Sequence, residues 1–293
     1  MKADGHSQFV SAPDGLRLHV RVYGARDGGR LPVVCLPGLS RNGSDFDILA
    51  GALSQAPGKS RRVLAVDFRG RGLSEYDSDP ANYSLPVELA DVVAILTALA
   101  AEPAIFIGTS RGGILTMLLA ALRPTAIAGA VFNDIGPVIE NTGVMRIKGY
   151  VGKLPQPASI EEGAAILRRQ AGAQFTRFTP DDWIDQARRN WWMKDGKLVP
   201  AYDTALSKTL EEADLDRPPP ALWAQFDAVP KAPLMVIRGE HSDILSAETV
   251  AAMKARRPDL TNVEIKGEGH PPQLEGALVD AIAAFAERCD RAR

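Results

Sequence analysis

The sequence has few of the residues that mark a disulfide-rich, secreted or membrane protein. Its only cysteines are Cys35, inside an apolar run, and Cys289, near the C-terminus, so no disulfide framework is expected and a reducing compartment suits the chain. No apolar run approaches the ~20 residues of a membrane span, and the N-terminal stretch lacks the apolar segment of a secretory signal. We therefore predict a cytoplasmic protein.

A strong charge imbalance and the common cofactor motifs are also missing. The 34 Lys and Arg nearly balance the 36 Asp and Glu, for a net charge of −2, so we expect neither nucleic acid nor a membrane as partner. The 4 histidines and 2 cysteines show neither H-E-x-x-H nor C-x-x-C spacing, and no Walker lysine or G-x-G-x-x-G is found. We predict a small-molecule substrate, with no metal and no cofactor. Whether the chain acts alone or as a homodimer is left open.

What the chain does contain is an alternation of short apolar runs with longer amphipathic ones. It begins with a hairpin around Pro13-Asp14-Gly15, a sequence suited to a tight turn. Buried strands are then predicted at 32–36, 62–67, 104–107, 128–132, 234–238 and 263–266, and helices at 44–53, 86–101, 111–122, 247–255 and 274–288. This alternation predicts an α/β fold, a mostly parallel sheet with helices on both faces.

The alternation stops between residues 138 and 230, where amphipathic helical pieces replace the strands. We interpret this segment as a helical cap inserted between the two parts of one core, 1–137 and 231–293. Trp191 and Trp192 lie in a part that we predict to be helical, so they cannot both face the same way. We expect one of them to line a substrate pocket and the other to pack inside the cap.

The sharpest motif is a G-x-S-x-G turn around Ser110. It follows the predicted strand 104–107 and precedes the predicted helix 111–122. A serine on a strained strand-to-helix turn needs small neighbours, which Gly108 and Gly112 provide, and the helix N-terminus favours a developing negative charge. The motif predicts that Ser110 is a nucleophile.

With this turn, the chain resembles the α/β-hydrolase superfamily over nearly its entire length. The resemblance implies a sheet of about eight strands and an oxyanion hole made by the backbone N–H groups of Leu39 and Arg111. Leu36-Pro37-Gly38-Leu39 stands where many members have a His-Gly loop, with Pro37 in place of the histidine. The turn at 67–74 resembles the family's D-x-R-G-x-G-x-S turn, and we assign it a structural role.

The base must be a histidine, because a serine hydroxyl is a poor nucleophile until a neighbouring group accepts its proton. His6 lies in a start that we expect to be disordered, and His19 lies in the N-terminal hairpin. His270 follows the last predicted strand, where the family places its catalytic histidine. His241 is the rival, but its loop more often carries the acid.

Two residues compete for the acid that orients the histidine. Asp243 matches the family's G-E-x-x-D pattern and agrees with the chain order Ser, Asp, His. Asp134 ranks second, because some members take the acid from the end of this earlier strand. The same loop that carries Asp243 contains Glu240, which we expect to anchor the backbone.

The predicted chemistry is acyl transfer through Ser110, with His270 passing the proton to the leaving group. A serine at the turn argues against dehalogenases and epoxide hydrolases, which have an aspartate there. We predict a carboxylesterase or lactonase acting on a small ester. The alternatives are hydrolysis of a carbon–carbon bond in a vinylogous diketone, and a small-molecule receptor. The Arg111 side chain could pair with a substrate carboxylate or with a neighbouring acid.

Overall fold

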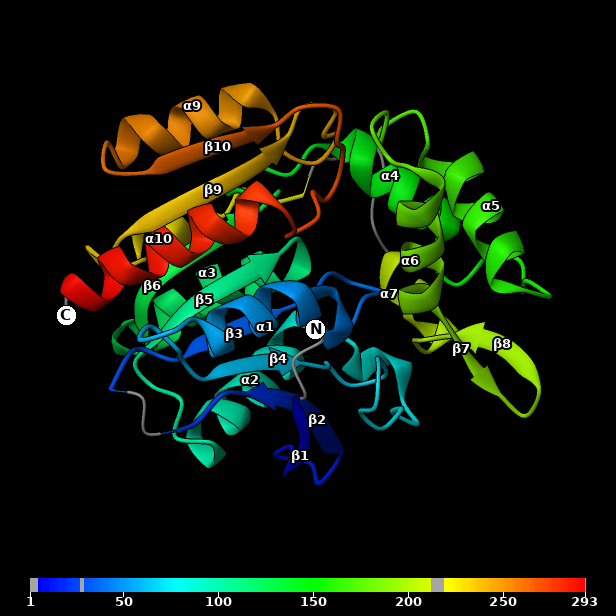
Figure 1. Ribbon diagram of the computed structural model, residues 1–293, viewed down its shortest axis with the longest axis horizontal. Coiled ribbons are helices and arrows are strands. Elements are labelled where there is room, and N and C mark those ends of the chain that lie inside the picture. The colour runs from blue at the N-terminus through cyan, green and yellow to red at the C-terminus, as the bar shows by residue number, and fades with distance from the viewer. Residues whose placement is uncertain (1–4, 27–28, 212–218, 293) are drawn as a thin grey trace.

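The computed structural model describes residues 5–26, 29–211 and 219–292. They form a central sheet with helices on both faces, and the elements between Asn141 and Glu211, which we call the cap after the predicted segment, lie beside one end of the strands (Figure 1). The sheet has the order β1-β2-β4-β3-β5-β6-β9-β10, in which β2 is antiparallel to its two neighbours and all other adjacent pairs are parallel. Its strands are β1 His6–Ser11, β2 Arg17–Tyr23, β3 Val33–Leu36, β4 Val63–Val66, β5 Ala104–Thr109, β6 Ile127–Asn133, β9 Leu234–Gly239 and β10 Thr261–Ile265. The predicted mostly parallel α/β-hydrolase sheet is confirmed.

The core helices follow the predicted spacing closely. They are α1 Asp47–Gln55, α2 Leu85–Ala98, α3 Arg111–Leu122, α9 Ala247–Arg256 and α10 Ala277–Arg291, with 3-10 turns at Gly43–Phe46, Pro80–Asn82 and Pro124–Ala126. Two further elements, α8 Trp223–Asp227 and a 3-10 turn at Thr204–Ser207, fall within the segment predicted as the cap. The helix predicted from 274 starts later, at Ala277. Gly276 precedes it with a φ of 56°, a left-handed conformation that glycine adopts readily.

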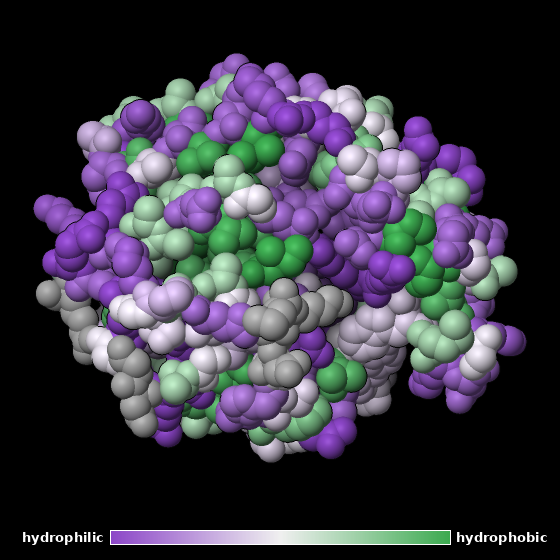
Figure 2. Space-filling view, viewed as in Figure 1, coloured by the Kyte–Doolittle hydropathy of each residue, from purple (hydrophilic) through white to green (hydrophobic). Residues whose placement is uncertain are grey.

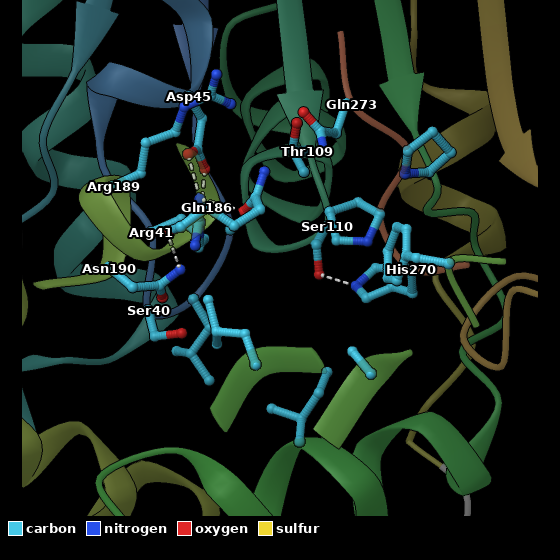
Figure 3. A pocket seen from close by; sticks show the side chains of 18 of the residues that line it. Ser40, Arg41, Asp45, Thr109, Ser110, Gln186, Arg189, Asn190, His270 and Gln273 are labelled. Carbon is cyan, nitrogen blue, oxygen red and sulfur yellow. Dashed lines mark hydrogen bonds and ion pairs between the residues drawn. The ribbon is translucent and has the colours of Figure 1, made fainter. Parts of the chain in front are cut away.

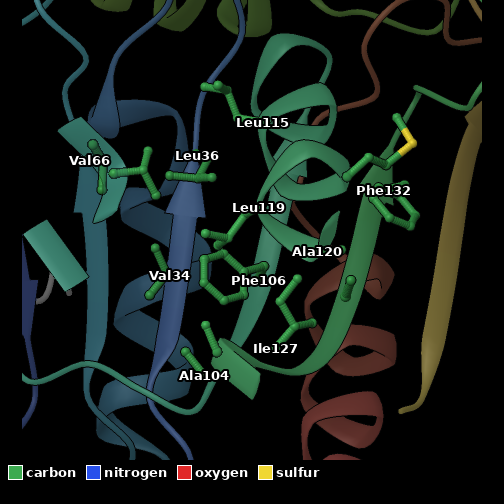
Figure 4. Packing of buried hydrophobic residues seen from close by; sticks show 14 of the residues in the cluster. Val34, Leu36, Val66, Ala104, Phe106, Leu115, Leu119, Ala120, Ile127 and Phe132 are labelled. Atoms are coloured by element: carbon green, nitrogen blue, oxygen red, sulfur yellow. The ribbon is translucent and has the colours of Figure 1, made fainter. Parts of the chain in front are cut away.

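Alternate side chains of β5 supply two hydrophobic cores, one on each face of the sheet. Ile105 and Ile107 pack with residues of α1 and α10. Ala104 and Phe106 face the opposite side and pack with Leu119 and other residues of α2 and α3 (Figure 4). Because both faces are covered, residues 104–107 of the strand are all apolar and show no period-two alternation, which is the pattern of a fully buried parallel strand.

The cap has its own small core. Its elements are α4 Asn141–Tyr150, α5 Ile160–Ala171, α6 Pro180–Asn190, β7 Trp191–Lys194, β8 Lys197–Pro200 and α7 Lys208–Glu211. Helix α6 begins at a capping box in which Thr179 and Asp182 bond to each other's backbone. Phe226 of α8, further along the chain, packs with the main core. The boundaries at 138 and 230 stay a prediction.

The helix predicted around the two adjacent tryptophans is wrong. Trp191 and Trp192 lie in β7, which pairs with β8 as an antiparallel hairpin. The hairpin turns at Asp195 and Gly196, both with positive φ, a pair suited to a two-residue turn. The helical interpretation overlooked this turn signal.

The surface gives no sign of a membrane-spanning segment. Figure 2 shows hydrophilic residues over most of the face in view, with hydrophobic ones in separate small groups. Among the residues that the structure describes, no helix is both long and apolar enough to cross a bilayer.

The packing of α3 leads to a stability prediction. Leu119 is fully buried beneath the sheet and Leu122, one turn later, is 63% exposed. Leu119→Ala should lower the free energy of unfolding by about 2–5 kcal/mol, because it removes buried methyl groups and leaves a cavity. Leu122→Ala, the matched control, should change it by less than about 0.5 kcal/mol. Urea denaturation measures both, and equal effects would contradict this packing.

Candidate active site

Ser110 stands in the tight turn between β5 and α3. Its backbone φ of 50° and ψ of −112° lie in a region that residues other than glycine rarely adopt. The turn packs against the end of β3: a Cβ atom on Gly112 would lie 2.1 Å from the carbonyl oxygen of Leu36. A Cβ atom on Gly108 would lie 2.5 Å from the backbone nitrogen of Gly113. Only glycine fits at these two positions, for the steric reason that the motif predicts.

A chain of two hydrogen bonds links Ser110, His270 and Asp134. The Ser110 hydroxyl lies 2.9 Å from Nε2 of His270, and Nδ1 of the same ring donates to Oδ2 of Asp134 at 2.8 Å. Figure 3 shows Ser110 and His270 side by side at the pocket. Because a carboxylate only accepts hydrogen bonds, the ring proton sits on Nδ1 and the lone pair of Nε2 faces the serine.

Asp134 is completely buried and held by three donors. Besides His270, the Gly239 N–H donates to Oδ1 at 2.8 Å and the Ser242 hydroxyl donates to Oδ2 at 2.6 Å. Its φ of 54° is again in the left-handed region. The surrounding bonds therefore hold both the backbone and the carboxylate of Asp134 in one orientation.

The prediction that Asp243 orients the histidine is wrong in this structure. Its carboxylate accepts two hydrogen bonds from Arg146 of α4, from Nε at 2.6 Å and from Nη2 at 2.9 Å. Its carbonyl oxygen accepts from the Gly143 N–H at 2.9 Å. Burial opposes the ionised form of Asp243, but the bonds to Arg146 outweigh it and hold its pKa below the usual value. Asp243 thus joins the cap to the core, and the second-ranked Asp134 contacts the histidine.

The loop after β3 lies beside the serine, as the resemblance implies. A Cβ atom on Gly38 would be 3.9 Å from Cβ of Ser110. Among the hydrogen bonds of the described residues, none uses the backbone N–H of Leu39 or of Arg111. Both groups remain available to an oxyanion, and this role stays a prediction.

The side chain of Arg111 pairs with an acid of the protein and does not face an open space for a substrate carboxylate. Its Nε donates to Oε2 of Glu88 at 2.5 Å and its Nη2 donates to the carbonyl oxygen of Tyr83 at 2.9 Å. Of the two partners left open by the sequence, the structure selects the neighbouring acid.

The pocket in front of Ser110 lies between the core and the cap. The core contributes residues 38–41 and 271–274, and the cap contributes one face each of α4, α5 and α6. Apolar cap side chains in the wall include Ile147, Leu167 and Trp183. Figure 3 shows a polar part of the wall beyond Ser110 and His270, where Arg41, Asp45, Gln186, Arg189 and Asn190 gather. The arrangement suits a substrate with both apolar and polar parts.

The expectation that Trp191 or Trp192 lines the pocket is wrong. Trp191 packs inside the cap and neither residue is in the pocket wall, where Trp183 stands instead. Trp183, Gln186 and Asn190 lie on one face of α6, at i, i+3 and i+7. That spacing is visible in the sequence, but it does not say whether the face meets a cavity or solvent.

The other histidines do not reach Ser110. His6 begins β1 and is not part of a disordered start, while His241 lies in the loop after β9. His19 bonds through Nδ1 to Asp67 at 2.8 Å and through Nε2 to Ser7 at 2.9 Å. This second Ser–His–Asp chain joins the N-terminal hairpin to the turn after β4 and lines no part of the pocket, so it makes a useful internal control.

The fold and the sequence together place the chain in the alpha/beta hydrolase family, which matches residues 33–288. The chain belongs to this family, and the resemblance predicted from the motifs is confirmed. Its relatives are hydrolases, several of them esterases.

Two hydrolases are among the relatives that cover most of the chain. A 3-hydroxybutyrate-oligomer hydrolase of Cupriavidus necator is 34% identical over 292 residues, covering 95% of each chain. A 2-(acetamidomethylene)succinate hydrolase of Mesorhizobium japonicum is 28% identical and covers 80% of this chain and 79% of its own. Among solved structures, an alpha/beta hydrolase from Novosphingobium aromaticivorans is 39% identical with a TM-score of 0.89, covering 98% of this chain and 99% of its own.

Two substitutions test which acid serves His270. Asp134→Asn should lower the kcat of ester hydrolysis by about 10³–10⁴-fold, because an amide NH₂ facing Nδ1 would favour the wrong ring tautomer. Asp243→Asn should leave kcat on a neutral ester within about threefold, since it breaks only the ion pair with Arg146. Steady-state kinetics measures both, and the opposite order of effects would restore Asp243 as the acid.

Asp243→Asn also has a stability signature. Because the folded pKa of Asp243 is depressed, the ion pair stabilises the fold above the unfolded pKa and is lost as pH falls through the folded one. The free energy of unfolding of the variant should therefore be about 1 kcal/mol lower than that of the wild type at pH 7. This difference should shrink at acid pH.

Proposed function

We propose that this chain is a serine hydrolase that cleaves a small carboxylic ester through an acyl-enzyme on Ser110. The observation that carries the proposal is the hydrogen-bonded chain Ser110–His270–Asp134, with Ser110 and His270 in the wall of the pocket. The strained turn, the buried acid and the unused N–H groups of Leu39 and Arg111 are the parts that acyl transfer requires.

The geometry supports the following sequence of steps. Nε2 of His270 takes the proton of the Ser110 hydroxyl while Oγ bonds to the ester carbonyl carbon, and the carbonyl oxygen becomes an oxyanion. The backbone N–H groups of Leu39 and Arg111 would stabilise that charge. His270 then protonates the leaving alkoxide as the carbon–oxygen bond breaks. A water, activated by the same ring, releases the acid and restores Ser110.

The relatives favour an ester over a carbon–carbon bond. A 3-hydroxybutyrate oligomer is a chain of ester bonds, and the relative named for it covers 95% of this chain. No relative described above is named for a carbon–carbon substrate. Short 3-hydroxybutyrate oligomers are therefore the first natural esters to test, with simple esters and lactones beside them.

The nucleophile is tested with a fluorophosphonate probe and p-nitrophenyl butyrate. The wild-type protein should form an adduct on Ser110, seen by mass spectrometry, and Ser110→Ala should lose the adduct and at least about 10³-fold of the turnover. Ser7→Ala removes the serine of the other Ser–His–Asp chain and should keep full activity. A wild-type protein with neither adduct nor turnover would reject the esterase proposal and favour a receptor role.

The charges of the pocket wall suggest an anionic substrate. Three arginines, Arg41, Arg146 and Arg189, line it, and each pairs with a carboxylate. Of those three carboxylates only Asp45 stands in the wall, whereas Asp243 and Glu275 lie outside it. The acid that pairs with Arg146, Asp243, lies outside the wall and beside Ser242, which bonds to Asp134. We propose that Arg146 receives a carboxylate of the substrate, a group that the compounds in both relatives' names carry.

The substitution Arg146→Gln distinguishes the binding of a substrate carboxylate by Arg146 from a general loss of activity. The substrates are the 3-hydroxybutyrate dimer and its carboxamide, which share the scissile ester and differ only in the terminal charge. The variant should raise KM for the dimer by about 10–100-fold, the worth of a charge-assisted hydrogen bond, and leave KM for the carboxamide within about twofold. Arg188→Gln, on exposed α6 surface, is the matched control. Equal losses on both substrates would contradict the proposal.

A further inference from the structure

Behind Ser110 lies a buried cluster of one carboxylate and two guanidinium groups. Oε1 of Glu88, in α2, is 2.7 Å from Nη1 of Arg71, and Oε2 accepts from Nε of Arg111 at 2.5 Å. The side chains of Glu88 and Arg71 are fully buried and that of Arg111 is 14% exposed. Burying two cations and one acid costs desolvation free energy that their mutual attraction only partly offsets. Apolar side chains of similar volume can often replace such a cluster without loss of stability.

The two guanidinium groups favour the ionised form of Glu88, and one polar atom of the cluster has no hydrogen-bond partner among the described residues. Burial opposes the charged form of Glu88, but the charges of Arg71 and Arg111 outweigh it and keep the pKa of Glu88 below its usual value. Nη2 of Arg71 is buried without a hydrogen-bond partner among the residues that the structure covers. Because stability alone does not explain a buried polar atom without a partner, a functional role of the cluster is expected.

Each of the two arginines is connected to one of the residues whose backbone N–H group is predicted to bind the oxyanion. Nε of Arg71 donates to the carbonyl oxygen of Leu39 at 2.8 Å. Arg111 is itself the residue after the serine, and its side chain is fixed at both ends, by Glu88 and by the carbonyl oxygen of Tyr83. Leu39 lies in the loop after β3 and Arg111 begins α3, and the carboxylate of Glu88 pairs with both arginines.

We propose that Glu88 is a positioning residue that, through Arg71 and Arg111, sets the distance between the two N–H groups of the oxyanion hole. The inference rests on the proposed function, since it needs an oxyanion to form at Ser110. The Arg71 bond fixes Leu39 from its carbonyl side, and the Arg111 bond fixes the first turn of α3. One short carboxylate then determines how far apart the two donors stand. Oxyanion holes stabilise the transition state only when both donors fit its geometry.

Glu88→Asp tests this, because it keeps the charge and shortens the side chain by one methylene. The matched control is Asp91→Asn on the same helix: Asp91 is as buried, binds Arg69 through two hydrogen bonds, and touches neither Arg71 nor Arg111. Denaturation by urea checks that each variant is folded. Glu88→Gln is the second variant, which keeps the length and an acceptor oxygen for Arg111.

The readout compares a transition-state mimic with a ground-state ligand. An alkyl trifluoromethyl ketone adds Ser110 Oγ to its carbonyl carbon, with the proton passing to His270, and leaves an oxyanion in the hole. Glu88→Asp should lower kcat for p-nitrophenyl butyrate by about 10–100-fold and raise the Ki of the ketone by the same factor. KM and inhibition by butyrate should stay within about twofold, as should all four quantities in Asp91→Asn. Glu88→Gln should fall between the wild type and Glu88→Asp.

Three results would overturn the inference. A folded Glu88→Asp variant with unchanged kcat and ketone Ki would remove the positioning role and leave the esterase proposal intact. Equal losses in Asp91→Asn would reduce Glu88 to a structural ion pair. A wild-type protein that neither hydrolyses esters nor reacts with the fluorophosphonate would instead reject the proposed function, and this inference with it.

Discussion

The site depends on one close approach, between the turn after β5 and the end of β3. Gly112 leaves no room for a Cβ atom there, so its backbone rests directly on Leu36, and Gly108 packs just as closely on the start of α3. This contact forces Ser110 into a left-handed conformation at the carboxyl ends of the parallel strands. The loops after β6 and β10 emerge at the same edge. His270 therefore lies within hydrogen-bond distance of both Ser110 and Asp134.

The choice of acid shows how tertiary contacts decide between positions that are locally equivalent. Strands β6 and β9 are adjacent and parallel, so the loops that carry Asp134 and Asp243 leave the sheet side by side. Asp134 reaches His270 because Gly239 and Ser242, from the rival loop, donate to its carboxylate. Asp243 is then drawn toward the cap by Arg146, and the loop that could have supplied the acid supports it instead.

Arginine–carboxylate pairs connect separate helices and loops around the pocket. The Arg146–Asp243 pair joins α4 of the cap to the core, and the Glu88 cluster joins α2 to the turns on both sides of Ser110. Pairs of this kind contribute little net stability, because the cost of removing charges from water offsets their attraction. Their directional bonds do fix geometry, which is the requirement of a pocket that orients an ester.

Local patterns in the sequence were enough to predict the sheet and most helices, and to choose Ser110 and His270 as the pair that the structure brings into contact, because each of these signals depends on spacing within a few residues. The acid, the wall of the pocket and the β7–β8 hairpin were not found in this way. Asp134 and Asp243 both lie in loops that follow a strand of the sheet, and Trp183 and Trp191 are both apolar cap residues. What separates them is contact with residues distant in the chain. The sequence by itself determined the strand-to-helix rhythm and the serine turn, whereas only the folded structure decided which carboxylate meets His270, because that depends on hydrogen bonds between loops more than 100 residues apart, such as 134 with 239 and 242.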